Sequence, residues 1–333
     1  MGGRHWWLAS ATLAVLAGAG TVQGFAMSAT CTHKFAKSPA IVYGTAWKKD
    51  KTEDLVFQAV SAGFRGIDTA CQPKHYFEPG VGAALARLAQ SGIAREEIFL
   101  QTKYTPFRGQ DPNNAPYDPK TPLDEQVRTS FEVSLRNLKT EYLDSWVLHS
   151  PLPTHRENML VWRAMEAKVE AGLVGQLGIS NCYDLPVFEA LYKDAAVKPA
   201  VLQNRFYADT GFDRELRAFC KANGIAYQSF WTLTANPEAL ASAPVKAAAR
   251  RLQCTPQEVF FAFVRAEGIT PLCRPARAPP SPLPRAAPFP RHHAAPGAER
   301  GPPLDDPAAS IIRTTLGTRR VRLVRKEGRD VSS

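Results

Sequence analysis

The sequence predicts a single α/β barrel, a (β/α)8 TIM barrel, in the middle of the chain. Between Ala40 and Cys273, eight short apolar runs alternate with longer segments of helical periodicity, the pattern of parallel βαβ units. The chain has 333 residues, and a barrel of this class occupies about 250 residues. No G-x-G-x-x-G follows any apolar run, so an open dinucleotide-binding sheet is not supported.

The eight predicted strands are short apolar runs of the length typical of buried parallel strands. They are Ala40–Trp47, Phe64–Ala70, Ile98–Tyr104, Tyr142–Ser150, Val174–Asn181, Ala200–Phe206, Ile225–Thr232 and Ile269–Cys273.

Seven predicted helices separate these strands. In the second, Val81, Leu85 and Leu88 recur on one helix face and Gly92 ends the helix. The others are expected at 52–62, 127–138, 162–171, 185–196, 212–222 and 255–266, and a Pro/Asn/Gly loop spans 105–122. An eighth helix, which should follow the last strand, is missing or replaced by a tail of different composition.

Composition divides the chain near Cys273. Its 44% hydrophobic and 22% charged content is ordinary for a globular protein and excludes wholesale disorder or a multispanning membrane protein. The 41 Lys and Arg exceed the 31 Asp and Glu by 10, which by itself suggests an acidic partner. However, residues 274–333 hold 12 basic and 5 acidic residues, so +7 of this charge lies in the tail and only +3 in the rest. We therefore expect no nucleic-acid partner.

The N-terminus resembles a targeting signal. Arg4 and His5 precede an apolar core at about Leu8–Val22, which has the length of a signal-peptide core but is too diluted by small residues for a membrane span. Residues 1–26 are interpreted as a signal that directs the chain to the secretory pathway or to an organelle such as a plastid. Translation from Met27 would instead leave a cytoplasmic protein.

Residues 274–333 form a Pro/Arg-rich tail that contains 11 of the 27 prolines. Proline lacks the backbone N–H and disfavours the helical conformation before it, so the start of the tail cannot be a helix. On composition we interpret the tail as disordered. A polyproline or Arg-rich binding arm is the functional alternative.

Ionisable and amide side chains accompany five successive predicted strands. They are Asp68, Lys103, His149, the pair Ser180 and Asn181, and Gln203. In a barrel, catalytic groups lie at the C-terminal ends of the strands, where the βα loops begin. This succession predicts an active site on one rim.

At these residues the sequence resembles the aldo-keto reductase family. The resemblance covers about Ala40 to Leu272, and its motifs keep their order along the chain. The matching stretches are Gly44-Thr-Ala-Trp47, Gly66-Ile-Asp68-Thr-Ala, Glu78 with Val81-Gly82, Leu100-Gln-Thr-Lys103, Leu143-Asp-Ser-Trp-Val-Leu-His149, Gly175-Gln-Leu-Gly-Ile-Ser-Asn181 and Gln203-Asn204. The resemblance implies a (β/α)8 barrel that reduces aldehydes or ketones with a nicotinamide cofactor, usually NADPH, with NADH left open.

By position, the resemblance implies a catalytic tetrad of Asp68, Tyr76, Lys103 and His149. When hydride reaches a carbonyl carbon, the oxygen must receive a proton. A phenol has a reference pKa of about 10, and a nearby ammonium such as that of Lys103 favours its ionised form. Asp68 would hold Lys103, and His149 would orient or polarise the carbonyl.

The resemblance also implies a nucleotide site and a substrate pocket. The cofactor-binding residues are Gly44, Thr45, Lys48, Ser180, Asn181, Gln203 and Phe230. The Ser180, Asn181 and Gln203 side chains correspond to groups that hold the nicotinamide amide. Phe230 corresponds to the aromatic residue that stacks on the ring, Lys48 approaches the pyrophosphate, and Trp47 lines the substrate pocket.

Two features depart from the family pattern. The family tyrosine usually follows its aspartate by five residues, where this chain has Pro73. Tyr76 comes three residues later and is the candidate, with His75 as its rival. After Cys273 the segment that grips the adenosine end of the cofactor in the family is replaced by the tail.

Two functions of different classes remain open. The first is an NADPH-dependent reductase that acts as a monomer on a small carbonyl compound. The second is a non-catalytic or decayed barrel that lacks the adenosine clamp. No metal site is predicted, because the seven His are scattered and His292-His293 has no acidic or Cys ligand at suitable spacing. Cys182 has no evident base partner and is interpreted as a packed residue.

Overall fold

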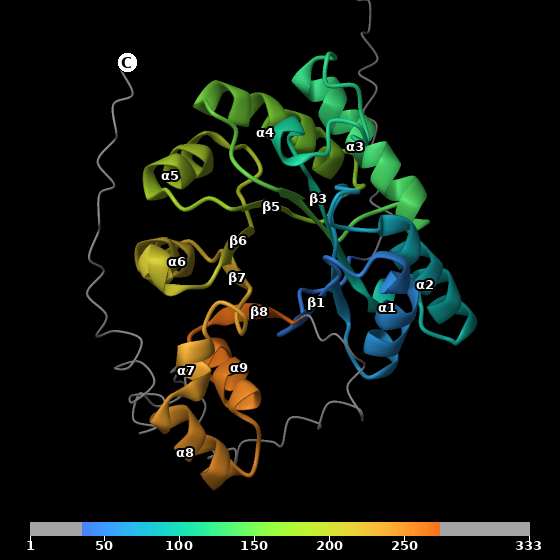
Figure 1. Cartoon of the computed structure of the whole chain (residues 1–333). Helices are drawn as coiled ribbons and strands as arrows, with labels where there is room; N and C mark the ends of the chain where they lie inside the picture. The colour runs from blue at the N-terminus through green and yellow to red at the C-terminus, as the bar shows by residue number, and fades with distance from the viewer. Residues whose placement is uncertain (1–34, 274–333) are drawn as a thin grey trace, which may run out of the picture. The chain divides into compact units, whose positions relative to one another are not determined.

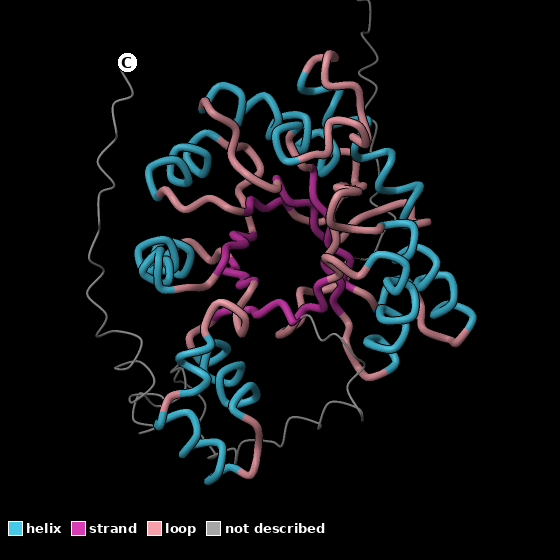
Figure 2. Tube along the Cα trace, in the orientation of Figure 1, coloured by secondary structure: helices cyan, strands magenta, loops and turns pink. Residues whose placement is uncertain are grey.

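The computed structural model describes residues 35–273, which form the predicted barrel. Eight parallel strands close into a ring in sequence order, because β1 pairs with β2 on one side and with β8 on the other. The ring lies inside a layer of helices (Figure 2). The strands are β1 (Val42–Gly44), β2 (Gly66–Asp68), β3 (Phe99–Tyr104), β4 (Ser145–Leu148), β5 (Leu177–Ser180), β6 (Val201–Arg205), β7 (Ala226–Phe230) and β8 (Ile269–Cys273).

All seven predicted helices are present, and they surround the strands as Figure 1 shows. They are α1 (Thr52–Ser61), α2 (Glu78–Gln90), α3 (Leu123–Leu138), α4 (His155–Glu170), α5 (Leu185–Asp194), α6 (Arg214–Ala222) and α9 (Pro256–Ala266). Local signals fix several ends. Thr154 and Glu157 form a capping box at the start of α4, and Thr255 and Glu258 form another at the start of α9.

The structure contains two helices between β7 and α9 that were not predicted from the sequence. They are α7 (Pro237–Ala241) and α8 (Ala243–Leu252). Each carries a proline, Pro237 or Pro244, in its first turn, where proline is tolerated because that N–H has no intrahelical partner. The buried stripe of α8 consists of Val245 and two alanines, so its apolar signal is weak.

The main core lies between the helices and the outer face of the strands. Phe131 of α3 packs on Trp146 of β4 with ring centroids 4.7 Å apart, and both side chains are buried. Close helix packing explains Gly82, because a methyl group there would overlap the carbonyl oxygen of Asn137 on α3. Gly82 therefore lets α2 approach α3.

The inside of the barrel is polar where a purely structural barrel would hold branched apolar side chains. Gln101, Gln203 and Gln228, from β3, β6 and β7, are almost completely buried and bond to one another across the barrel. This layer lies below the C-terminal rim and supports the groups described next.

The predicted signal segment (1–26) and the tail (274–333) lie outside the described residues, as does the position of an eighth helix. Within residues 35–273, no helix is both long enough and apolar enough to cross a membrane.

Candidate active site

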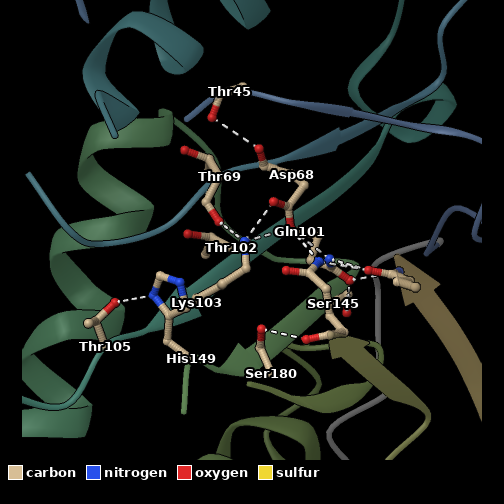
Figure 3. Close-up of polar contacts among 12 residues, drawn as sticks. Thr45, Asp68, Thr69, Gln101, Thr102, Lys103, Thr105, Ser145, His149 and Ser180 are labelled. Carbon is tan, nitrogen blue, oxygen red and sulfur yellow. Dashed lines mark hydrogen bonds and ion pairs between the residues drawn. The ribbon is translucent and has the colours of Figure 1, made fainter. Parts of the chain in front are cut away.

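The predicted catalytic residues gather at the C-terminal ends of neighbouring strands. Asp68 is the last residue of β2, Lys103 is the penultimate residue of β3, and His149 directly follows β4. Ser180 ends β5. Figure 3 shows these four side chains around one part of the rim.

Asp68 and Lys103 form a buried ion pair. The Lys103 ammonium donates to both carboxylate oxygens of Asp68, at 2.7 and 2.6 Å, and to the carbonyl oxygen of Thr69 at 2.8 Å (Figure 3). The two side chains are 3% or less exposed. Burial lowers the pKa of Lys103, and the Asp68 carboxylate opposes that shift. The lysine is thus fixed in direction by three acceptors.

A layer of glutamines holds Asp68 from below. Gln101 and Gln203 each donate a hydrogen bond to the same carboxylate oxygen of Asp68, at 2.7 and 3.0 Å. Both also donate to the side-chain oxygen of Gln228, at 2.8 and 2.9 Å. Gln101 and Gln228 were not among the predicted site residues, although a glutamine within a buried strand must find a polar partner inside the barrel and so gives a usable signal.

Gln203 therefore has a structural contact in addition to its predicted role. Both hydrogens of its amide nitrogen are engaged by Asp68 and Gln228. Its carboxamide oxygen receives no hydrogen bond within residues 35–273, so that oxygen is the atom open to a ligand.

Tyr76, rather than His75, lies beside the buried lysine. The Lys103 Nζ is 5.2 Å from the centroid of the Tyr76 ring, and the Tyr76 and His149 rings are edge to face at 5.9 Å. The His75 ring instead stacks on Trp47, 4.0 Å away. The longer loop after β2 thus brings the phenol next to both Lys103 and His149.

His149 is held as a neutral imidazole. Its Nδ1 lies 2.6 Å from the Thr105 hydroxyl oxygen (Figure 3). Burial, and then the positive charge of Lys103 and the nearby His75, lower the pKa of His149 well below its ordinary value. A neutral imidazole beside Tyr76 can orient a carbonyl oxygen without competing for the proton.

Several predicted cofactor residues bind neighbouring strand ends in this structure. Thr45 donates to the carbonyl oxygen of Asp68 at 3.0 Å, and Ser180 donates to that of Gln203 at 2.7 Å. Asn181 donates to the carbonyl oxygen of His149 at 2.9 Å. These contacts join adjacent strands and fix the shape of the rim.

The remaining predicted residues also lie at strand ends. Gly44 ends β1 in register with Asp68, and Phe230 ends β7. Lys48 is buried, with its Nζ 5.2 Å from the Tyr43 ring. Cys182 is buried too, and burial raises the pKa of its thiol to about 12.

Exposed aromatic rings mark the mouth of the barrel. Trp47, after β1, and Trp231, after β7, are 55% and 47% exposed. Both adopt left-handed backbone angles, with φ of +63° and +56°, as does Asn181 after β5 with +53°. Such angles in bulky residues cost about 1–3 kcal/mol each and cluster at functional sites. Trp231 was not identified from the sequence.

No metal site accompanies these residues. Among residues 35–273, no group of three or more His, Cys, Asp or Glu side chains is placed to hold a metal ion.

Comparison with known proteins agrees with this geometry. A family model described as "Aldo/keto reductase family" matches residues 39–237. The glyoxal reductase of Bacillus subtilis is 33% identical over 182 residues, which are 54% of this chain and 58% of that protein. The NAD/NADP-dependent indole-3-acetaldehyde reductase of Schizosaccharomyces pombe is 31% identical over 207 residues, 59% of this chain and 65% of that protein. This chain therefore spans less than two thirds of the length of these two relatives.

A solved structure agrees as well. The aldo/keto reductase of Brucella melitensis superposes with a TM-score of 0.60 at 27% identity, covering 73% of this chain and 87% of that one. The matched family segment is well over half of the chain and contains all four members of the predicted tetrad. The chain belongs to the aldo/keto reductase family.

Proposed function

We propose that the chain reduces small aldehydes or ketones to alcohols with NADPH, and that Tyr76 donates the proton. The observation that carries the proposal is the position of the Tyr76 ring, beside the Lys103 ammonium and edge to face with His149. These are the groups needed to protonate a carbonyl oxygen and to stabilise the charge that develops on it. The names of both bacterial and yeast relatives specify aldehyde-type substrates.

The donor and acceptor groups of the rim fit a nicotinamide nucleotide. The carboxamide oxygen of Gln203 can accept a hydrogen bond from an amide, and Phe230 at the end of β7 offers a flat ring for stacking. When bound, the dihydronicotinamide supplies a hydride to the carbonyl carbon. Asn181 and Ser180, fixed by their bonds to neighbouring strands, border the same place.

Three side chains of this chain then act on the carbonyl group, each with its own role. The hydroxyl proton of Tyr76 passes to the carbonyl oxygen as negative charge develops there. Lys103, held by Asp68, stabilises the phenolate that remains. Neutral His149 orients the oxygen.

The test compares Tyr76→Phe with His75→Gln in the full chain. With glyoxal as the probe substrate, Tyr76→Phe should lower kcat by about 10²- to 10⁴-fold, the typical contribution of a general acid. NADPH affinity, measured by calorimetry, should stay within about threefold of wild type, because the phenol is not a nucleotide contact. His75→Gln should retain most of kcat.

Two results would contradict the proposal. One is turnover in Tyr76→Phe close to the wild-type rate. The other is a wild-type chain that does not bind NADPH even at millimolar concentration, which would favour a non-catalytic barrel.

A further inference from the structure

We infer that Arg205, held in an aromatic cage at the end of β6, binds the pyrophosphate of the nucleotide. The inference rests on the proposed function and adds a residue to it. Neither the sequence motifs nor the predicted cofactor residues include Arg205.

Three aromatic rings surround the Arg205 guanidinium. Its central carbon lies 4.1 Å from the centroid of the Trp231 ring, 5.1 Å from that of Tyr207 and 6.0 Å from that of Phe230. The backbone N–H of Arg205 donates a hydrogen bond to the Tyr183 hydroxyl oxygen at 3.1 Å, which anchors the main chain of this residue. The guanidinium is therefore held in place by stacking, which orients its plane.

The charge of Arg205 has no carboxylate partner within residues 35–273. No carboxylate lies within ion-pair distance, and no acceptor receives a hydrogen bond from its guanidinium in this part of the chain. Its Nε is buried and unpaired. By contrast, the guanidinium of Arg87, which also stacks on an aromatic ring, pairs with Asp54 at 2.9 Å. An oriented cation with unused donors at a binding rim indicates an anionic ligand.

The position of Arg205 indicates that its ligand is the nucleotide rather than the carbonyl substrate. Arg205 is in register with Phe230 on β7 and two residues beyond Gln203 on β6, so it borders the predicted nicotinamide site. Tyr76 follows β2, which is four strands away from β6 in a ring of eight and so lies across the barrel. In the proposed function the carbonyl lies near Tyr76, so the anionic group within reach of Arg205 is the pyrophosphate that continues from the nicotinamide.

A guanidinium suits this ligand chemically. Its planar fork of N–H groups matches two phosphate oxygens at once. The rings around it limit access of water to the charge, which strengthens the contact. The exposed Trp231, held at a strained φ of +56°, covers one face of the guanidinium.

The experiment measures binding of NADPH and of NADH by calorimetry to the full chain. The variants are Arg205→Met, which keeps an unbranched apolar side chain but removes the charge, and Arg205→Lys, which keeps the charge but not the fork. Arg87→Met is the matched control, because it removes an aromatic-stacked arginine on α2, outside the rim. Thermal melts establish that each variant is folded.

Arg205→Met should weaken both nucleotides by the same factor, about 10- to 100-fold, as expected for hydrogen bonds to a charged group. Arg205→Lys should show a smaller loss for both, and it remains informative if Arg205→Met does not fold. Arg87→Met should bind like wild type. The weakening of wild-type binding by added salt should be reduced in Arg205→Met.

Three results would overturn the inference. Unchanged affinity in both Arg205 variants, with a wild-type chain that binds NADPH, would overturn it while leaving the proposed function intact. A loss for NADPH alone would place Arg205 at the 2′-phosphate instead of the pyrophosphate. A wild-type chain that binds neither nucleotide would overturn this inference and the proposed function together.

Discussion

The barrel contains a buried aspartate ion pair at each end. At the N-terminal ends of the strands, Asp144 pairs with Arg95 at 2.9 Å, and at the C-terminal ends Asp68 pairs with Lys103 at 2.6 Å. Both aspartate side chains are 3% exposed or less. Burial and pairing alone therefore do not distinguish a catalytic carboxylate from a structural one.

The partners at the N-terminal end are mostly main-chain groups. Asp144 accepts from the backbone N–H of Ala36 at 2.6 Å and of Leu100 at 2.9 Å. Arg95 donates to the carbonyl oxygens of Ile98 and Tyr142. This pair connects the starts of neighbouring strands, so we expect it to stabilise the fold.

At the C-terminal end the partners of the carboxylate are side chains, although Lys103 also donates to the carbonyl oxygen of Thr69. Asp68 binds the side chains of Lys103, Gln101 and Gln203 through its carboxylate. A carboxylate that fixes side chains can set the position of an ammonium, whereas one that fixes the backbone sets the position of a strand. Partner type, more than burial, therefore separates the structural role from the proposed catalytic one, in line with the general division of barrel faces.

The largest effect is expected from removal of the Asp144–Arg95 ion pair. Asp144→Ala leaves Arg95 without its carboxylate, and it leaves the buried N–H of Leu100 and the half-buried N–H of Ala36 without that acceptor, so the free energy of unfolding should fall by about 3–5 kcal/mol. Urea denaturation measures this loss. Asp194→Ala, which removes an exposed pair with His155, should lower the free energy of unfolding far less. Reductase activity per folded molecule should be unchanged in Asp144→Ala; a selective loss of kcat would contradict the division of roles.

The next effect is on the Asp68–Lys103 pair, which we propose to be catalytic. Lys103→Met removes the ammonium beside Tyr76, and kcat should fall by about 10²- to 10³-fold, the usual effect of losing one group that stabilises developing charge. NADPH affinity should change little in calorimetry. The control is Lys168→Met, which removes a lysine of α4 that lies over the ring of Phe131, and it should keep kcat. Equal kcat in the two variants would show that Lys103 has only a structural role.

The smallest expected effect is a pH dependence of the free energy of unfolding that comes from His149 at the rim. Because burial and Lys103 lower the pKa of His149 in the folded chain, the unfolded chain binds a proton below about pH 6.5 that the folded chain does not. The associated stability is fully present above about pH 6.5 and is lost as the pH falls toward the folded pKa. The slope contributed is at most about 1.4 kcal/mol per pH unit. Urea titrations should show a shallower acid slope for His149→Gln than for wild type, and parallel slopes would rule out this assignment.

The order of strands and helices could be predicted because its signals are local. Alternating apolar runs and helical stripes are properties of neighbouring residues, and they placed Asp68, Lys103 and His149 at strand ends. The two missed helices, α7 and α8, have weak stripes and prolines in their first turns.

The loop after β2 shows why the rest required the structure. Gln72 donates to the carbonyl oxygen of Gly109, and Cys71 N–H donates to that of Lys103. These contacts join residues more than thirty positions apart, and they determine that Tyr76 lies beside Lys103 while His75 lies against Trp47. Sequence spacing alone left both residues as candidates.

The sequence by itself determined the barrel, the family motifs and the rim on which the reactive groups lie, because strand ends follow from short-range periodicity. The tertiary structure decided which side chains meet: the glutamine layer under Asp68, the phenol over Lys103 and the aromatic cage of Arg205. These contacts connect strands across a closed ring. Only the closure of that ring, which brings β1 against β8 and β2 opposite β6, fixes their distances.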